Sequence, residues 1–317
     1  NMNNLKKIGL TALAGSLVAT SAFAGELTVT GAASMGVANI TGTADDSLGK
    51  NFSMGNSVYL AGSGEMDNGM TVSISFELDT GALSTSTVAG PFDSHHVEIG
   101  SDALGTLRLA GHGGSSAQSA VEVTAAGDLW NNTLGLTGTI TNAEAGDNNL
   151  FYTLPEVMDS LVLTASMAPR DATNAETHMS YAAVYTGVEG LTLKYGMGDF
   201  GTKAAGGDTT SMSASYAIGS ITATASSSTS DSVSASTDVD LTSYQVAYTV
   251  SEDISLTYGT ETFDKDGSAT DEEVTGYGIS YTTGGMTISG SVINAEGGKY
   301  VAGADTDKWS LTAAFAF

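Results

Sequence analysis

The sequence predicts an all-β fold, a sixteen-stranded antiparallel β-barrel that spans a membrane. Three observations predict it. Apolar residues alternate with small polar ones along most of the chain, this alternation divides into sixteen segments, and the connections between the segments are by turns short and long. Alternation with period two gives a strand one apolar and one polar face, which suits a wall between lipid and water.

The N-terminal stretch is expected to be a signal peptide and not part of the fold. Lys6 and Lys7 precede an apolar run that is too short to cross a bilayer as a helix, and an Ala-Phe-Ala triplet at 22–24 matches the pattern before a cleavage site. We therefore expect a signal peptide over 1–24, export to the outer membrane, and one barrel domain over 25–317.

The alternating segments follow in order after this leader. In the first of them Leu27, Val29 and Met35 share one face, while Thr28 and Thr30 lie on the other. Applied along the chain, the same pattern predicts strands over 26–40, 51–66, 69–80, 92–100, 105–112, 148–154, 160–169, 175–187, 190–199, 208–218, 220–228, 238–250, 253–263, 271–283, 285–295 and 305–317.

The connections between these strands also follow a pattern. Short turns such as 67–68 alternate with longer loops such as 41–50, the longest is 113–147, and 170–174 is the one weak member of the long set. A serine-rich run over 226–236 is interpreted as a mobile loop. Tight turns at one end and long loops at the other are typical of an up-and-down outer-membrane barrel.

A spanning sheet must close on itself, because the bilayer core cannot hydrogen-bond a free edge. Sixteen strands leave a water-filled interior, whereas side chains would fill a barrel of eight. The outward faces carry tyrosines near strand ends, as an interfacial girdle requires: Tyr181, Tyr185, Tyr244, Tyr248, Tyr277 and Tyr281. The fold prediction therefore indicates a channel.

The composition excludes several functional classes. The 317 residues include 35 acidic and 10 basic ones, for a net charge of −25, and no cysteine. Nucleic acid is therefore not expected as a partner. Disulfides and cysteine-based metal sites are excluded outright.

Motifs for catalysis are weak, and we expect no enzyme. Alternation places His95 and His96 on opposite faces, and the Gly-x-Gly-x-x-Gly pattern at 196–201 has no helix behind it, so it is interpreted as a chance match. No catalytic residue and no cofactor are expected, apart from weakly bound calcium in an acidic outer loop, with candidate ligands Asp264, Asp266 and Asp271.

The chain resembles the general outer-membrane porins of alpha-proteobacteria over its whole mature length. The residues that carry this resemblance are the opening Gly-Glu-Leu-Thr-Val-Thr-Gly at 25–31 with Met-Gly-Val at 35–37, the fifth strand Gly-Thr-Leu-Arg-Leu-Ala-Gly at 105–111, and the final Phe317. The resemblance implies passive diffusion of small hydrophilic solutes and ions, a homotrimer, and a terminal aromatic read by the assembly machinery. It also implies that the long third loop, 113–147, folds into the lumen.

The resemblance further implies a constriction in which loop acids face basic side chains on the wall. The expected pore-constriction residues are Arg108 and Lys194 on the wall and Glu122, Asp128, Glu144 and Asp147 on the loop, with Arg170 and Lys308 as lesser candidates. The basic side is thin, and the Pro-Glu-Phe-Gly-Gly loop motif of enterobacterial porins is absent. A net negative passage concentrates cations, so we expect a cation preference.

Two other functions remain open. A ligand-selective channel would use lumen aromatics such as Tyr59 and Phe151 as a track for sugars or other small nutrients. A non-transport barrel would be an adhesin acting through acidic loops or an outer-membrane enzyme. Outer-membrane lipid and lipopolysaccharide are the expected surroundings in every case.

Overall fold

The structure is a computed structural model that describes residues 27–43, 49–79, 92–121, 124–126, 129, 134, 136–170, 176–202, 206–233 and 238–317. The expected signal peptide over 1–24 lies outside the described residues, and so do Glu122 and Asp128.

Sixteen strands form the fold, as the sequence predicts: β1 (Thr28–Gly42), β2 (Gly49–Glu65), β3 (Thr71–Asp79), β4 (Ser94–Ser101), β5 (Gly105–His112), β6 (Asn149–Thr153), β7 (Leu161–Ala168), β8 (His178–Val188), β9 (Leu191–Phe200), β10 (Gly207–Ile218), β11 (Ile221–Ser232), β12 (Val239–Thr249), β13 (Ile254–Lys265), β14 (Glu272–Thr283), β15 (Met286–Glu296) and β16 (Thr306–Ala316). A single turn of 3-10 helix, η4 (Gly298–Tyr300), lies between β15 and β16. The described residues contain no helix of the length and apolarity needed to cross a membrane.

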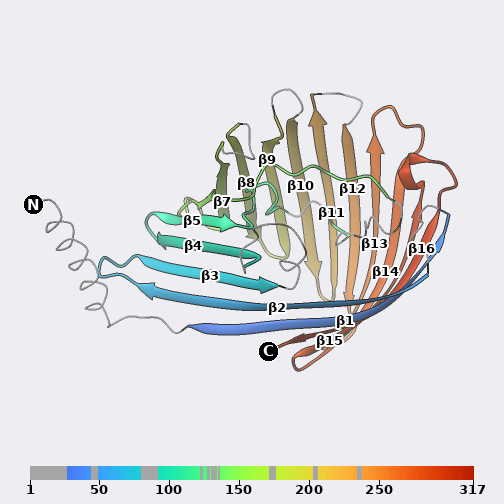
Figure 1. The fold of residues 1–317 in the computed structure, drawn as a ribbon, viewed down its shortest axis with the longest axis horizontal. Coiled ribbons are helices and arrows are strands. Elements are labelled where there is room, and N and C mark those ends of the chain that lie inside the picture. Colours follow the sequence, from blue (N-terminus) through green and yellow to red (C-terminus); the bar gives the residue numbers. More distant parts are fainter. Residues whose placement is uncertain are drawn as a thin grey trace, which may run out of the picture.

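The strands form a closed antiparallel barrel in which each pairs with its neighbours in sequence and β1 pairs with β16 (Figure 1). At this seam Met35 lies opposite Ala313, and Gly31 and Phe317 exchange backbone hydrogen bonds of 2.7 and 3.0 Å. The ring of Phe317 occupies the space that a Cβ at Gly31 would need. Closure leaves no unpaired edge, which is the condition for a sheet in a bilayer.

The two faces of the wall are separated as expected. Tyr181 is 50% exposed and Tyr244 is 55% exposed, whereas their chain neighbours Ser180 and Ser243 are at most 1% exposed. Around the barrel, large exposed apolar residues occupy every second position of a strand, hereafter the apolar-face parity. Serines and threonines occupy the positions between them, the polar-face parity. In a membrane-spanning barrel the apolar face meets lipid and the polar face encloses water.

The largest departure from the expected strand ends concerns β11. The interpretation of 226–236 as a mobile loop is wrong for its first part, because β11 continues to Ser232. Ser226, Ser228 and Ser230 all lie on the polar face and are at most 5% exposed, since other parts of the chain cover them. A serine-rich composition therefore reflects a covered polar wall here, not a loop.

Candidate functional site

The connection between β5 and β6, hereafter the 113–147 segment, runs across the polar face of the wall (Figure 1). Its backbone N–H groups donate hydrogen bonds to serine hydroxyls on four different strands. These bonds are Ala117 N to Ser166 Oγ on β7 (2.9 Å), Gln118 N to Ser180 Oγ on β8 (2.7 Å), Ala125 N to Ser226 Oγ on β11 (2.8 Å) and Ala126 N to Ser243 Oγ on β12 (2.8 Å). Small hydroxyl side chains satisfy the buried amides while letting the backbone approach closely.

Glycines on the polar face also let the 113–147 segment approach the wall closely. A Cβ at Gly259 on β13 would lie 2.7 Å from the Cβ of Ala126, and one at Gly196 on β9 would lie 3.0 Å from the Cα of Gln118. A Cβ at Gly259 would therefore force a shift, and one at Gly196 would be tighter than most real Cβ contacts. The glycine pattern at 196–201, interpreted as a chance match to a dinucleotide motif, thus includes two positions, Gly196 and Gly198, where the segment packs closely on the wall.

The far part of the segment packs on apolar side chains of the wall. Two buried clusters hold it: Leu134 and Leu136 with Val274, Ile293 and Ala295, and Ile140 with Val239, Leu241 and Phe263. These wall residues belong to β12, β13, β14 and β15 and interrupt a face that is elsewhere polar. Apolar residues at polar-face parity are the sequence signal that would have predicted where the segment docks.

Two fully buried glutamates fix the middle of the segment. Glu272 on β14 accepts hydrogen bonds from Thr137 N (2.9 Å) and Thr137 Oγ1 (3.0 Å) and from Gly138 N, and Glu261 on β13 accepts one from Leu129 N (3.1 Å). Both carboxylates are 0% exposed. Hydrogen bonds to carboxylates are stronger than neutral ones. The sequence analysis missed both residues, although each falls at polar-face parity in its strand.

Arg108 lies on the polar face of β5, as predicted, between Leu107 and Leu109 on the other face. Its guanidinium carbon is 4.7 Å from the ring centroid of Phe151 on β6, and Glu98 on β4 is its direct cross-strand neighbour. In the described part of the chain no ion pair joins the two side chains, so Glu98 lowers the local positive potential of Arg108 only as a neighbouring charge on the same face.

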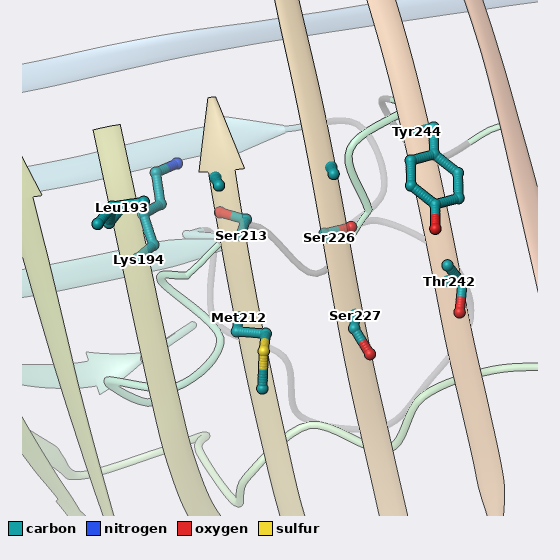
Figure 2. Close-up of a pocket in the computed structure, with 10 residues that line it drawn as sticks. Leu193, Lys194, Met212, Ser213, Ser226, Ser227, Thr242 and Tyr244 are labelled. Carbon is teal, nitrogen blue, oxygen red and sulfur yellow. The ribbon is translucent and has the colours of Figure 1, made fainter. Parts of the chain in front are cut away.

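Lys194 lies on β9 opposite Ser213 of β10. Figure 2 shows Leu193 and Lys194 leaving β9 in different directions, beside a pocket that Met212, Ser226 and Tyr244 also line. The alternation thus places Lys194 on the polar face, as it does Arg108.

The two described acids of the segment lie near its C-terminal end. Glu144 N donates to the backbone oxygen of Asp199 (2.9 Å), which fixes this part of the segment to β9. Asp147 Oδ1 lies 2.6 Å from His112 Nδ1, the last residue of β5. The structure therefore brings Asp147 together with His112, a residue that the sequence analysis did not assign to this place.

Another group of wall acids escaped the sequence analysis. Glu77 and Asp79 on β3 and Asp93 before β4 have carboxylate oxygens that all lie within 4.8 Å of one another. Ser94 Oγ also donates to Glu77 Oε2 (3.0 Å). Glu77 shares its face with Tyr59, its cross-strand partner on β2, so it belongs to the polar face.

The expected calcium ligands do not form a comparable group. Among the described residues, Asp264, Asp266 and Asp271 are not close enough for their carboxylates to share one ion. Asp264 instead lies directly opposite Asp240 on β12.

Asp264 belongs to a row of exposed carboxylates on the apolar-face parity, at the strand ends that join the long connections. The row comprises Asp208, Asp231, Asp240, Asp264, Glu273, Glu296 and Asp307. Three pairs of them are direct cross-strand neighbours, and the two lysines of β10 to β16 lie at the opposite parity. Like charges placed directly opposite repel, so this row favours a countercharge.

Among the described residues outside the strands, only Tyr300 of η4 has a clearly displaced pKa. Burial, followed by the negative charge of Glu272, raises the pKa of Tyr300 above its ordinary value. The Lys265 ammonium lies 5.5 Å from the centre of its ring. Tyr300 therefore stays neutral at any physiological pH.

Comparisons with known proteins agree with this architecture. The model of the Gram-negative porin family matches residues 9–317. A search of curated proteins found no match.

Among solved structures, the anion-selective porin from Comamonas acidovorans is 13% identical, with 92% of this chain and 99% of that chain covered and a TM-score of 0.69. A variant of the Rh. blastica porin is 14% identical, with 92% and 100% covered and a TM-score of 0.66. OmpT of Vibrio cholerae in its trimer form is 12% identical, with 93% and 100% covered and a TM-score of 0.68. At these identities the three structures show a shared fold alone.

The family match and the fold lead to one conclusion. The match covers nearly the whole chain, and the described residues form a closed sixteen-stranded barrel with one apolar and one polar face. The chain belongs to the Gram-negative porin family and is a channel protein of the outer membrane.

Proposed function

We propose that the chain forms a water-filled channel for passive diffusion of small hydrophilic solutes and ions, and that the 113–147 segment narrows it. The observation that carries this proposal is the closed wall with a polar face on which the segment is held from Ala117 to Glu144. A segment anchored along a wall occupies cross-section without plugging the barrel. The proposal assigns no catalytic role to any residue.

Purified chain inserted in a planar phospholipid bilayer tests the channel. Discrete, steady open levels are expected, because a closed sixteen-stranded wall encloses water. A chain that inserts without conducting would instead support the non-transport alternatives, an adhesin or an enzyme.

We propose that the channel prefers cations. The wall acids Glu77, Asp79 and Asp93 support this, because Arg108, the nearest polar-face base in the neighbouring strands, already faces Glu98. The Comamonas porin of similar fold is anion-selective, so the fold alone does not decide the sign. Fixed charge in a pore does, because it concentrates the opposite ion.

Reversal potentials across a salt gradient measure this preference. The double variant Glu77→Gln, Asp79→Asn should have a weaker cation preference than the wild type. Glu296→Gln, which removes a carboxylate at the apolar-face parity, should change the preference little. An anion-selective wild type would contradict the proposal.

The ligand-selective alternative rests on Tyr59 and Phe151. Both lie on the polar face, but Arg108 covers one face of the Phe151 ring. Liposome swelling with sugars of graded size separates the two functions. A smooth decline with mass supports passive diffusion, and saturation by one sugar supports ligand selection.

We propose a homotrimer, in line with the trimer form of Vibrio cholerae OmpT. His95 supports it, because this partly exposed imidazole lies at apolar-face parity, packed against Phe76 and Phe92. A polar ring facing lipid is unfavourable, whereas a neighbouring copy could satisfy it. Crosslinking of the purified chain in detergent should give a three-chain product.

We propose lipopolysaccharide as the lipid partner of the carboxylate row, with divalent cations, calcium among them, between the carboxylates and lipid phosphates. The directly opposed pairs Asp208 with Asp231 and Asp240 with Asp264 support this, because they favour an external countercharge. Copurifying lipopolysaccharide should fall on washing with a chelator and should fall further in the Asp240→Asn, Asp264→Asn variant. Retention unchanged in both cases would contradict this proposal.

A further inference from the structure

Gln118 occupies a special place in the 113–147 segment. The residue is 0% exposed, and each polar group of its side chain has a partner. Its Nε2 donates to Ser211 Oγ on β10 (2.6 Å), and its Oε1 accepts from the backbone N–H of Ala143 (2.9 Å). Its own backbone N–H donates to Ser180 Oγ on β8 (2.7 Å). Gln118 thus joins two strands of the wall, β8 through its backbone and β10 through its side chain, to the distant part of the segment near Ala143.

The two parts that Gln118 joins are the outgoing arm, near Gln118, and the returning arm, near Ala143. Both arms rest on β9, which carries glycine where they touch it. A Cβ at Gly196 would lie 3.0 Å from the Cα of Gln118, and one at Gly198 would collide with the Cβ of Ala143. Both arms are therefore in direct contact with the wall, and the side-chain amide of Gln118 spans the space between the two arms.

The partners of Gln118 are themselves enclosed. Ser211 is 0% exposed and also accepts a hydrogen bond from Ser228 Oγ (3.0 Å), which is 1% exposed. A buried network of this kind holds one arrangement when every group is paired and loosens when one member is lost. The returning arm has a second attachment at Glu144 N, to the Asp199 backbone oxygen, and the middle of the segment is held separately by Glu272.

We propose that Gln118 is the positioning residue that holds the returning arm against the wall and thereby sets the open cross-section of the channel. This inference rests on the proposed function, in which the segment borders the passage. Because the arm already touches β9, a released arm can move in only one direction, away from the wall and into the water of the lumen. Loss of the Gln118 amide therefore narrows the passage intermittently.

The test compares single-channel recordings of the full chain and its variants. Gln118→Leu keeps the size of the side chain and removes both hydrogen bonds, so brief closures and a lower mean open current are expected. Ser119→Ala is the matched control, because the Ser119 side chain bonds only within its own turn, to the backbone oxygen of Ser116. Wild-type current is expected for this control.

Two further variants separate positioning from general stability. Gln118→Glu keeps an acceptor for the Ala143 N–H and lets the Ser211 hydroxyl act as donor. This variant should therefore show the steady open level of the wild type. Gln118→Asn keeps the amide but is too short to reach both partners, and it should show the closures even if Gln118→Leu does not assemble. The thermal unfolding of the barrel should be unchanged in each variant that assembles, since the strand ladder is intact.

A steady, wild-type open level in assembled Gln118→Leu or Gln118→Asn would overturn the inference. Closures in Gln118→Glu like those of Gln118→Leu would overturn it as well. These outcomes differ from failure of the proposed function. If the wild type itself showed no open level, the channel proposal would fall, and with it the premise of the inference.

Discussion

Replacing Glu272 by glutamine should loosen the middle of the 113–147 segment while leaving the barrel intact. The carboxylate of Glu272 is 0% exposed and receives hydrogen bonds from Thr137 N, Thr137 Oγ1 and Gly138 N. Glutamine keeps one acceptor oxygen and turns an NH₂ group toward an N–H, so at least one bond to a charged acceptor is lost.

Such a bond contributes about 1.5–3 kcal/mol, which raises the population of the detached segment roughly 10- to 150-fold. The matched control is Glu273→Gln, the same chemical change one residue along on the exposed, opposite face. Limited proteolysis in detergent should cleave Glu272→Gln near 129–140 faster than the wild type, whereas Glu273→Gln should be cleaved at the wild-type rate. Equal cleavage of the two variants would refute this account of the anchor.

Three other substitutions test the close contact at Gly259, the packing of Phe263 and the charge of Arg108. Gly259→Ala should alter the open-channel current, because its Cβ would meet the backbone and Cβ of Ala126, and the cost of such overpacking is about 1–3 kcal/mol. Phe263→Ala should lower the free energy of unfolding in urea by about 3–5 kcal/mol, since the ring is 2% exposed in a packed cluster, and a change below about 1 kcal/mol would contradict that packing. Arg108→Gln should shift the reversal potential toward stronger cation preference, because it removes a positive charge from the polar face while the neighbouring Glu98 remains, and a shift toward anions would contradict this placement of Arg108.

The strands were predictable because each one separates two solvents. Facing lipid on one side and water on the other requires apolar and polar residues to alternate along each strand, which can be seen in the sequence. The limits expected for β5, 105–112, coincide with those observed. The prediction was wrong in β11 after residue 228, where serines at both parities hid the alternation. Composition cannot distinguish a covered polar wall from a loop, because the same small hydroxyl side chains suit both.

The placement of the predicted constriction residues was decided in part by the sequence. Alternation was enough to place Arg108 and Lys194 on the polar face, since a side chain's face follows from its position in a strand. It could not supply their neighbours. Glu98 beside Arg108 and His112 beside Asp147 depend on strand register and on the path of the segment.

The sequence by itself therefore determined the barrel, the faces of its wall and the family. Only the tertiary structure decided how the 113–147 segment is held, because each of its anchors joins residues far apart in the chain. The bond from Thr137 to Glu272 spans 135 residues and that from Ala126 to Ser243 spans 117. Alternation is a property of neighbours within one strand, whereas these contacts exist only after the barrel has closed and brought β8 to β14 around the same segment.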